Sequence, residues 1–290
     1  MTADGEPREA ALDAPATVLR AASAGLMGLV HPEALADPHH RPQRDDPPFE
    51  WEPLEVSLAP DRLTELVERQ VARWAGAAPI VAASLLVREI TGLVIAVAVD
   101  LWGTSRRVLD LSLGNLELAC TPDATRMALR QAGLRVVPGD PLAGAHGVTT
   151  TEVGDLRTAL LSTVLDETVP AVIESMQSAV RTGTRHLWGN VALGIANGFT
   201  SVSHTHAGAD DERRRFLAHR PELARTIELV TVDDGLGGAL TCALRRNCCL
   251  LDEVDRTYRC ATCSLDHDPQ RRERVVAHYL AERRAARRVS

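Results

Sequence analysis

The sequence predicts an α+β fold with a helical majority: a helical bundle, a small antiparallel sheet and a C-terminal region built around cysteines. Three observations lead to this fold. Apolar residues recur at helical spacing over residues 60–74 and again over 153–201. Apolar and polar residues alternate over 106–120, as they do in strands that bury one face, and residues 227–232 and 239–244 resemble two paired strands separated by an acidic, glycine-rich turn. Four of the six cysteines lie within residues 248–263.

The chain is long enough for one large domain or two small ones, because 45% of its 290 residues are hydrophobic and can fill a core. We divide it into an N-terminal extension (1–55), a main helical and sheet region (56–240) and the cysteine-containing C-terminal region (241–290). Within the extension, residues 16–30 predict a helix. The segment 31–53, rich in proline, histidine and aspartate, predicts an extended loop.

The main region begins with two predicted helices. Residues 60–74 carry apolar side chains three and four positions apart, which indicates an amphipathic helix starting at a proline. A longer apolar run follows at 79–102, interrupted by Arg88 and Glu89. Its uninterrupted part is far shorter than the ~20 residues that cross a bilayer. We therefore expect a buried helix here and no membrane span.

Residues 106–120 predict a β-hairpin that turns at a Leu-Gly-Asn sequence. Residues 121–133 then predict a short helix, capped by Thr121 and ended by Gly133. A loop is expected at 138–147.

The rest of the main region predicts further helices and then two paired strands. The helix at 185–201 is apolar nearly all round and should run through the interior. The other predicted elements are helices at 153–165, 169–180 and 211–219 and strands at 227–232 and 239–244.

The charge distribution limits the partners. A net charge of −7 argues against a general nucleic-acid binder, because such proteins present a basic face to the phosphates. Residues 269–290 are the local exception, with seven arginines against two glutamates. A solvated amphipathic helix end explains this excess more simply than a docking site for an acidic partner.

The most specific pattern is the spacing of four cysteines: Cys248 and Cys249 are adjacent, ten residues follow, and Cys260 and Cys263 form a Cys-x-x-Cys pair. Four thiolates so spaced can close disulfides, hold a tetrahedral zinc ion or ligate an iron–sulfur cluster. The N-terminus has neither the basic start nor the apolar core of a secretory signal, so we expect reduced thiols rather than disulfides.

The spacing favours a cluster over zinc. Zinc ligands usually come as two well-separated Cys-x-x-Cys pairs, whereas adjacent cysteines in an extended chain point to opposite sides. A [2Fe–2S] cluster is larger and offers two irons, each needing two thiolates, so neighbouring side chains can reach different parts of it. Cys120 and Cys242 lie outside the pattern and are interpreted as core residues.

The motif, preceded by Arg245, Arg246 and the glycine-rich run 235–238, resembles that of the FhuF-type ferric-siderophore reductase family. The Leu-Trp-Gly-Asn sequence at 187–190 is similar to a Trp-Gly-Asn segment of such proteins, and residues 79–86 show a weaker similarity. The resemblance implies an iron-transport oxidoreductase that acts in the cytoplasm, where it could also lie against the inner face of the membrane.

The resemblance further implies the cofactor and its ligands: a [2Fe–2S] cluster held by Cys248, Cys249, Cys260 and Cys263. The cluster would pass one electron to a ferric siderophore so that Fe(II) is released. An external donor, ferredoxin-like or a reductase, would refill it. No catalytic residue is expected beyond the cluster.

Five residues are candidates for contacting the siderophore: Arg185, Trp188, Asn190, Arg245 and Arg246. Arginine and asparagine can donate hydrogen bonds to the oxygens of an anionic chelate. Trp188 also has a simpler interpretation as a core aromatic residue that needs only a partner for its indole N–H.

Two other functions use the same cysteines. The protein could be a [2Fe–2S] electron carrier or a redox or iron sensor without a substrate of its own, or a structural zinc-binding module. A separate metal site at His204, His206, Asp210 and Asp211 fits no common closed geometry, and capping of the following helix explains Asp210 more simply.

Overall fold

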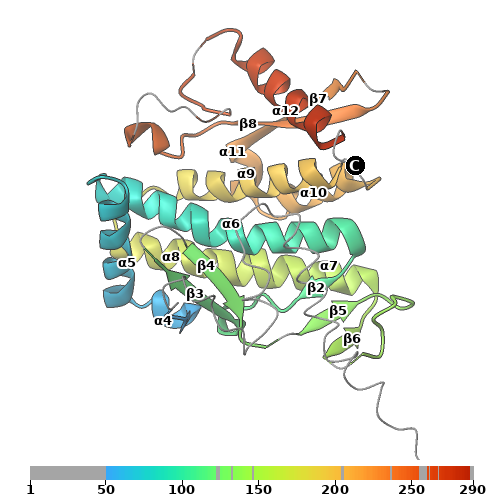
Figure 1. Cartoon of the computed structure of the whole chain (residues 1–290), viewed down its shortest axis with the longest axis horizontal. Helices are drawn as coiled ribbons and strands as arrows, with labels where there is room; N and C mark the ends of the chain where they lie inside the picture. The colour runs from blue at the N-terminus through green and yellow to red at the C-terminus, as the bar shows by residue number, and fades with distance from the viewer. Residues whose placement is uncertain are drawn as a thin grey trace, which may run out of the picture.

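The computed structural model describes residues 50–121, 125–131, 133–145, 147–203, 206–235, 237–254, 260, 262–266 and 268–287. The helix expected at 16–30 and nearly all of the loop expected at 31–53 lie outside the described residues. The described elements form an α+β fold with a helical majority, as the sequence predicts (Figure 1).

The longest helix, α6 (Pro79–Ser105), lies in the middle of the molecule (Figure 1). Its valine, leucine and isoleucine side chains point in all directions around the axis, so it must be covered on every side. Within the described ranges it is the one helix that is long and apolar enough to cross a membrane, and 72% of its most apolar stretch is buried inside the protein. The expected buried helix is thus the core helix of the fold.

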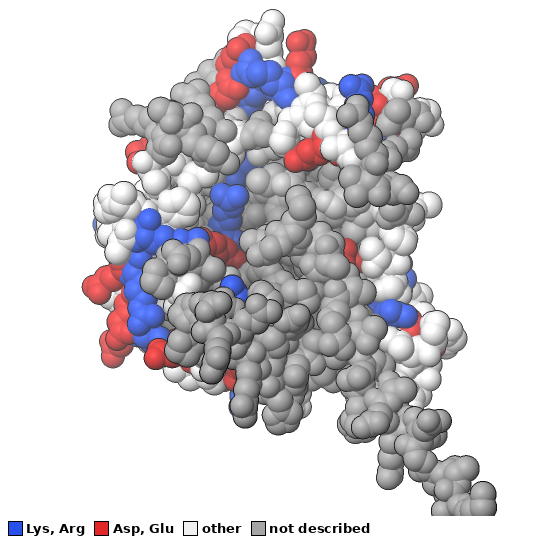
Figure 2. Space-filling view, in the orientation of Figure 1, with Lys and Arg blue, Asp and Glu red and all other residues white. Residues whose placement is uncertain are grey.

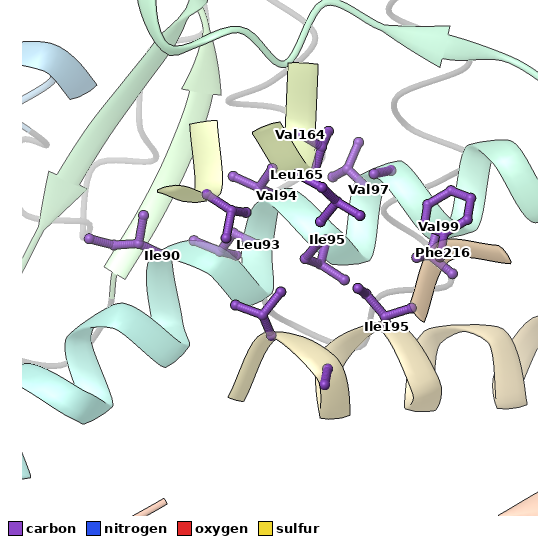
Figure 3. Packing of buried hydrophobic residues seen from close by; sticks show 14 of the residues in the cluster. Ile90, Leu93, Val94, Ile95, Val97, Val99, Val164, Leu165, Ile195 and Phe216 are labelled. Carbon is purple, nitrogen blue, oxygen red and sulfur yellow. The ribbon is translucent and has the colours of Figure 1, made fainter. Parts of the chain in front are cut away.

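Helix α9 (Thr184–Val202) packs along α6. Ile195 of α9 lies close to Ile95 of α6 at the centre of the contact (Figure 3). A Cβ atom added to Gly198 would lie 2.9 Å from Val99 Cγ1, so the glycine lets the two helix backbones approach closely. The interior course expected for the helix at 185–201 is confirmed, since eleven residues of α9 are buried.

A second helical layer covers the other side of α6. It runs from α7 (Val153–Leu161) through a wider, π-helical stretch (Ser162–Thr168) into α8 (Val169–Ala179). Pro170 lacks a backbone N–H, and a π-helical stretch is one way for a helix to absorb that missing bond. Val164 and Leu165 of the π-helical stretch point toward α6 (Figure 3). Helix α5 (Pro60–Arg73) packs on α6 and α8.

The other helices are shorter or lie at the periphery of the described fold. Helices α10 and α11 pack on α9, and α12 packs on the last strand. The bounds are α4 (Leu54–Ser57), α10 (Ala209–Ala218), α11 (Pro221–Thr226), α12 (Arg271–Arg287) and a single 3-10 turn, η3 (Leu251–Glu253).

Two small three-stranded sheets lie against the helices. One has the order β1 (Glu52–Pro53), β3 (Leu116–Cys120), β4 (Thr125–Leu129), all antiparallel. The other has the order β2 (Val108–Leu109), β5 (Leu134–Val136), β6 (Val148–Thr150), with β5 and β6 parallel.

The hairpin expected at 106–120 is wrong. Its two halves, β2 and β3, belong to different sheets, and the Leu-Gly-Asn sequence forms a 3-10 turn (Leu113–Asn115) between them. Alternation identified both strands but not their partners, because period-two patterning says only which face is buried.

The helix expected at 121–133 is also wrong, since β4 occupies this range and pairs with β3 from Leu116↔Leu129 to Cys120↔Thr125. Alanine, methionine, leucine and arginine in β4 are good helix formers, and the available edge of β3 overrides that weak local preference. The loop expected at 138–147 is confirmed by its turns.

The last strands, β7 (Ile227–Asp233) and β8 (Ala239–Arg245), form the antiparallel pair that the sequence predicts, in register from Ile227↔Arg245 to Asp233↔Ala239. This ribbon and α12 lie beyond α9, on the side away from α6 (Figure 1). The buried ion pair of Arg283 with Asp234 (2.7 Å) fixes α12 to the turn between the strands. The chain leaves β8 directly into the cysteine region.

Charged side chains of both signs lie next to one another along the left edge and the top of the face seen in Figure 2. Ion pairs among the charged residues include Arg62 with Glu52 (2.8 Å) and Arg274 with Asp268 (2.6 Å). The basic C-terminal helix therefore has acidic neighbours, as expected for a solvated helix.

Candidate metal centre

Two segments bring the four cysteines together: the residues after β8, which carry Cys248 and Cys249, and those before α12, which carry Cys260 and Cys263. The thiols of Cys249 and Cys260 share a hydrogen bond. The other two lie close enough to act electrostatically on this pair. None of the six cysteines forms a disulfide. In the described part of the chain, no three ligand-type side chains converge as they would around a single ion.

Backbone N–H groups point at the first two sulfur atoms. Leu250 N–H donates to Cys248 Sγ at 3.2 Å, and Leu251 N–H donates to the Cys249 thiol. Leu250 adopts a left-handed conformation (φ 68°), which turns the chain so that both amides face back toward the cysteines. Hydrogen bonds of this kind favour thiolate, the form that binds metals. Cys263 N–H donates to Cys260 O at 2.9 Å and closes the Cys-x-x-Cys turn.

The thiols differ in how readily they ionise. The hydrogen bond from Cys260 lowers the pKa of Cys249 against the effect of burial, and Arg245 and Arg88 act in the same direction. The same hydrogen bond raises the pKa of Cys260, which keeps its proton. Burial raises the pKa of Cys248. The Cys249–Cys260 pair therefore favours a thiolate on Cys249 beside a protonated Cys260, and a bound metal would displace the proton of Cys260.

A series of buried hydrogen bonds connects the first cysteine pair to helices α6 and α9. Ser84 Oγ of α6 donates to Cys249 O at 3.1 Å. Asn190 Nδ2 of α9 donates to Ser84 O and Ser84 Oγ, both at 3.3 Å. Arg245 Nη2 in turn donates to Asn190 Oδ1 at 2.5 Å. Since all three side chains are buried, the two core helices fix the position of the first cysteine pair.

Two further contacts tie the segments to the fold. Arg271, at the start of α12, donates to Arg245 O at 2.8 Å and to Thr262 O at 3.3 Å, so it joins β8 to the Cys-x-x-Cys turn. Asn247 donates to His186 O at 3.4 Å, and its side chain lies over Gly189 of α9. The cysteine region thus rests on the first turns of α9.

The structure places the five candidate siderophore contacts in different environments. Asn190 and Arg245 lie beside the cysteines but are buried. Trp188 is also buried, and its ring packs under the Arg220 guanidinium (4.9 Å), in keeping with its interpretation as a core residue. Arg185 is exposed at the start of α9. Arg246 is exposed and lies 3.9 Å from Glu228.

Sequence reasoning missed three residues of this site: Ser84, Arg88 and Arg271. Ser84 and Arg88 lie one helical turn apart on α6, so they share a face. Ser84 could have been noticed as a polar residue within the apolar run at 79–102. Buried polar side chains are nearly always hydrogen-bonded, so its position indicates a hydrogen-bond partner. Arg271 left no signal, since arginine is frequent throughout the C-terminal region.

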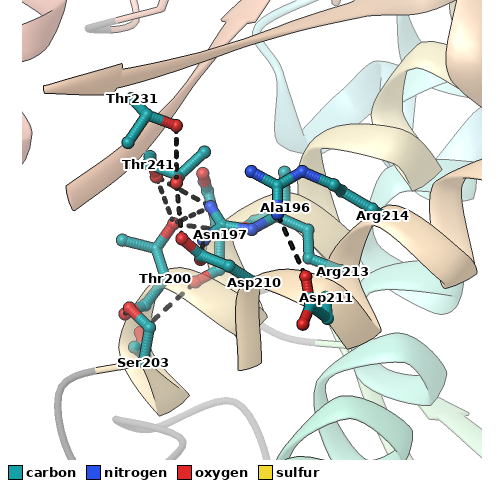
Figure 4. Close-up of polar contacts among 11 residues, drawn as sticks. Ala196, Asn197, Thr200, Ser203, Asp210, Asp211, Arg213, Arg214, Thr231 and Thr241 are labelled. Carbon is teal, nitrogen blue, oxygen red and sulfur yellow. Dashed lines mark hydrogen bonds and ion pairs between the residues drawn. The ribbon is translucent and has the colours of Figure 1, made fainter. Parts of the chain in front are cut away.

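The alternative metal site does not form among the described residues. The sequence suggested that Asp210 caps the following helix, but Asp210 lies inside the first turn of α10, whose N-cap is Gly208. Asp210 accepts hydrogen bonds from Thr241 Oγ1 (2.6 Å) and from the buried Arg213 (Figure 4). Arg213 also donates to Thr241 O (2.7 Å) and to Thr200 Oγ1 (3.0 Å). His204 lies outside the described residues.

The two remaining cysteines lie elsewhere. Cys242 is fully buried in β8, as expected for a core residue. Cys120 is partly buried at the end of β3, near Thr125. No protein-family model and no curated protein matches this sequence.

Proposed function

We propose that the protein is a ferric-siderophore reductase that holds a [2Fe–2S] cluster on Cys248, Cys249, Cys260 and Cys263. The observation that supports this proposal is the hydrogen bond between the thiols of Cys249 and Cys260, which brings the two cysteine pairs next to each other near buried Arg245. Thiolates and amide donors to sulfur are the protein groups that hold and tune such clusters.

The proposed reaction needs no general acid or base. When bound, the cluster supplies one electron, which reduces chelated Fe(III) to Fe(II). The hard oxygen donors of a siderophore hold Fe(II) far less tightly than Fe(III), so iron is released without breaking the ligand. An external one-electron donor, ferredoxin-like or a reductase, restores the centre after each turnover. Release of Fe(II) for cellular use places the reaction in the cytoplasm.

The chain's own residues provide the environment for this reaction. Helices α6 and α9 exclude water from one side of the cysteines, since Ser84 and Asn190 are buried there. Arg88, exposed one turn beyond Ser84, acts electrostatically on Cys249 and has no ion-pair partner among the described residues. We therefore place the approach of an anionic ferric chelate on the Arg88 side of the site.

The decisive experiment is the visible spectrum of anaerobically purified protein, before and after dithionite and then after addition of a ferric hydroxamate. Charge-transfer bands that bleach and then return would support electron transfer to the siderophore. A centre that bleaches but is not reoxidised would indicate a carrier or sensor. A colourless protein with stoichiometric zinc would overturn the reductase and leave a structural module.

Substitution of one ligand tests the assignment of the site. Cys260→Ser is expected to lose most of the visible absorbance and bound iron, because a neutral serine hydroxyl is a poor ligand for iron–sulfur clusters. Cys120→Ser is the matched control, since Cys120 is a partly buried cysteine outside the site, and it should retain the wild-type spectrum. Iron and sulfide analysis gives the occupancy of each variant. An unchanged spectrum in Cys260→Ser would contradict the ligand assignment.

A further inference from the structure

Arg245 differs from the other buried arginines. Arg213 and Arg283 each form an ion pair, with Asp210 and Asp234 respectively. Arg245 is only 2% exposed, yet no carboxylate lies within ion-pair distance of it among the described residues. Its Nη2 donates to the neutral Asn190, and its Nε has no hydrogen-bond partner. A buried cation without a counter-charge is unfavourable, so an anion should face it.

Hydrogen bonds connect Arg245 to the first cysteine pair, because its partner Asn190 donates to Ser84 Oγ and Ser84 Oγ donates to Cys249 O. Arg245 also acts electrostatically on Cys248, Cys249 and Cys260. His186 is the other titratable group affected by it, and its pKa is lowered by burial and then by Arg245. The negative charge that would balance Arg245 is therefore the charge of the cysteine site when that site is occupied.

We infer that Arg245 is the fixed counter-charge of the cysteine site and that it favours the more negative, reduced state of the [2Fe–2S] centre held there. This inference rests on the proposed function for its cofactor. An oxidised [2Fe–2S] centre with four thiolates carries a charge of about −2, and one electron makes it about −3. A buried cation stabilises the second state more than the first, because Coulomb energy scales with charge and is weakly screened there. Asn190 and Ser84 position Arg245 for this role.

The next residue in the chain provides a matched control. Arg246 follows Arg245 directly, but successive residues of an extended chain point to opposite sides. Its side chain is exposed and lies 3.9 Å from Glu228. Water and this carboxylate screen its charge. The two arginines thus have equal formal charge and nearly equal sequence position, but only one is buried against the cysteines.

The test is the midpoint potential of the centre in cluster-loaded protein, measured by anaerobic optical redox titration without siderophore. Arg245→Met is expected to lower the equilibrium constant for one-electron reduction at least tenfold, which is 59 mV. Arg246→Met should change it less than twofold, and Arg245→Lys should keep most of the wild-type value. Iron and sulfide content establishes equal loading. A loaded Arg245→Met protein within twofold of wild type, or an equal shift in Arg246→Met, would overturn the inference.

A second variant leaves Arg245 in place, in case Arg245→Met does not fold. Asn190→Asp would pair Arg245 with a nearly isosteric carboxylate and cancel its field at the cysteines. It should therefore lower the same equilibrium constant at least tenfold, and an unchanged value would contradict the inference. Because no siderophore is present, a shifted potential upholds the inference even if siderophore fails to reoxidise the centre. A wild-type protein that binds no cluster would overturn both proposals.

Discussion

At the scale of single residues, Gly189 lets the segment ahead of the cysteines lie against α9. A Cβ atom at this position would lie 2.1 Å from Asn247 Nδ2 and 2.5 Å from its Cγ. No side chain fits unless Asn247 moves, and that movement would break its hydrogen bond to His186 O. Glycine at this position is therefore explained by the close approach of the Asn247 side chain to α9. Helix propensity does not explain it, because glycine destabilises a helix interior.

Gly189→Ala should lower the free energy of unfolding by about 1 kcal/mol, because overpacking of 1–3 kcal/mol exceeds the gain in helix propensity. Gly92→Ala on α6 is the control, since nothing lies within 4 Å of its added Cβ, and it should be neutral or slightly stabilising. Urea unfolding measures both. The double variant Gly189→Ala, Asn247→Ala should recover the loss. A stabilised Gly189→Ala protein would mean that Asn247 moves away without cost.

At the scale of elements, buried polar contacts connect the helices that the apolar core packs together. Glu212 of α10 accepts hydrogen bonds from Trp102 Nε1 of α6 (2.8 Å) and from Arg157 of α7 (3.0 and 3.1 Å). Burial opposes ionisation of Glu212, but these hydrogen bonds outweigh it and lower the pKa of the carboxyl below its usual 4.5. The carboxylate of Glu212 thus links three helices from separate parts of the chain.

Glu212→Gln should reduce the free energy of unfolding by about 2 kcal/mol at neutral pH, the usual value of hydrogen bonds to a charged group. A lowered folded-state pKa stabilises the protein above the unfolded-state pKa, and this contribution disappears as the pH falls through the folded-state value. The difference between wild type and variant should therefore shrink below about pH 4.5. Unfolding at pH 7, 5 and 3 measures it.

The control for this prediction is Glu65→Gln, which removes an exposed ion pair with Arg62 and should cost less than about 0.5 kcal/mol at every pH. A difference between wild type and Glu212→Gln that stayed constant down to pH 3 would contradict the lowered pKa. It would assign the loss to packing instead.

At the scale of the whole molecule, the four cysteines of the site lie outside the apolar core cluster. Helices α6 and α9 bury each other's apolar side chains, and α7 and α8 cover the opposite side. The described residues within 246–270 are held to this core by polar contacts such as those of Ser84 and Arg271. A bound metal centre would supply much of their remaining order, as it does in other small metal-binding regions.

Removal of the proposed metal centre should therefore loosen the cysteine region and leave the core intact. Amide hydrogen exchange of cluster-free protein is expected to be at least tenfold faster than that of loaded protein within 246–270, and unchanged in α6 and α9. The control is Cys120→Ser protein treated with the same chelator. It lacks a thiol outside the site, and its exchange should match that of chelator-treated wild type. Faster exchange throughout α6 and α9 would show that the core folds only with the centre.

The sequence by itself determined the elements whose patterns are long. The apolar run of α6, the apolar surface of α9 and the paired strands β7 and β8 were predicted, because each pattern extends over several turns or residue pairs and depends on what its own side chains bury. The cysteine spacing indicated a metal centre for the same reason, since ligand spacing is local.

Only the tertiary structure decided which elements meet. The strand β4 has a helix-forming sequence and became a strand because the edge of β3 was available. The support of the cysteines by Ser84 joins residues 165 positions apart, and Arg245 and Arg246 are neighbours in sequence but opposite in burial. Such pairings depend on how whole helices pack, because burial and counter-charges are properties of the folded chain and not of any one segment.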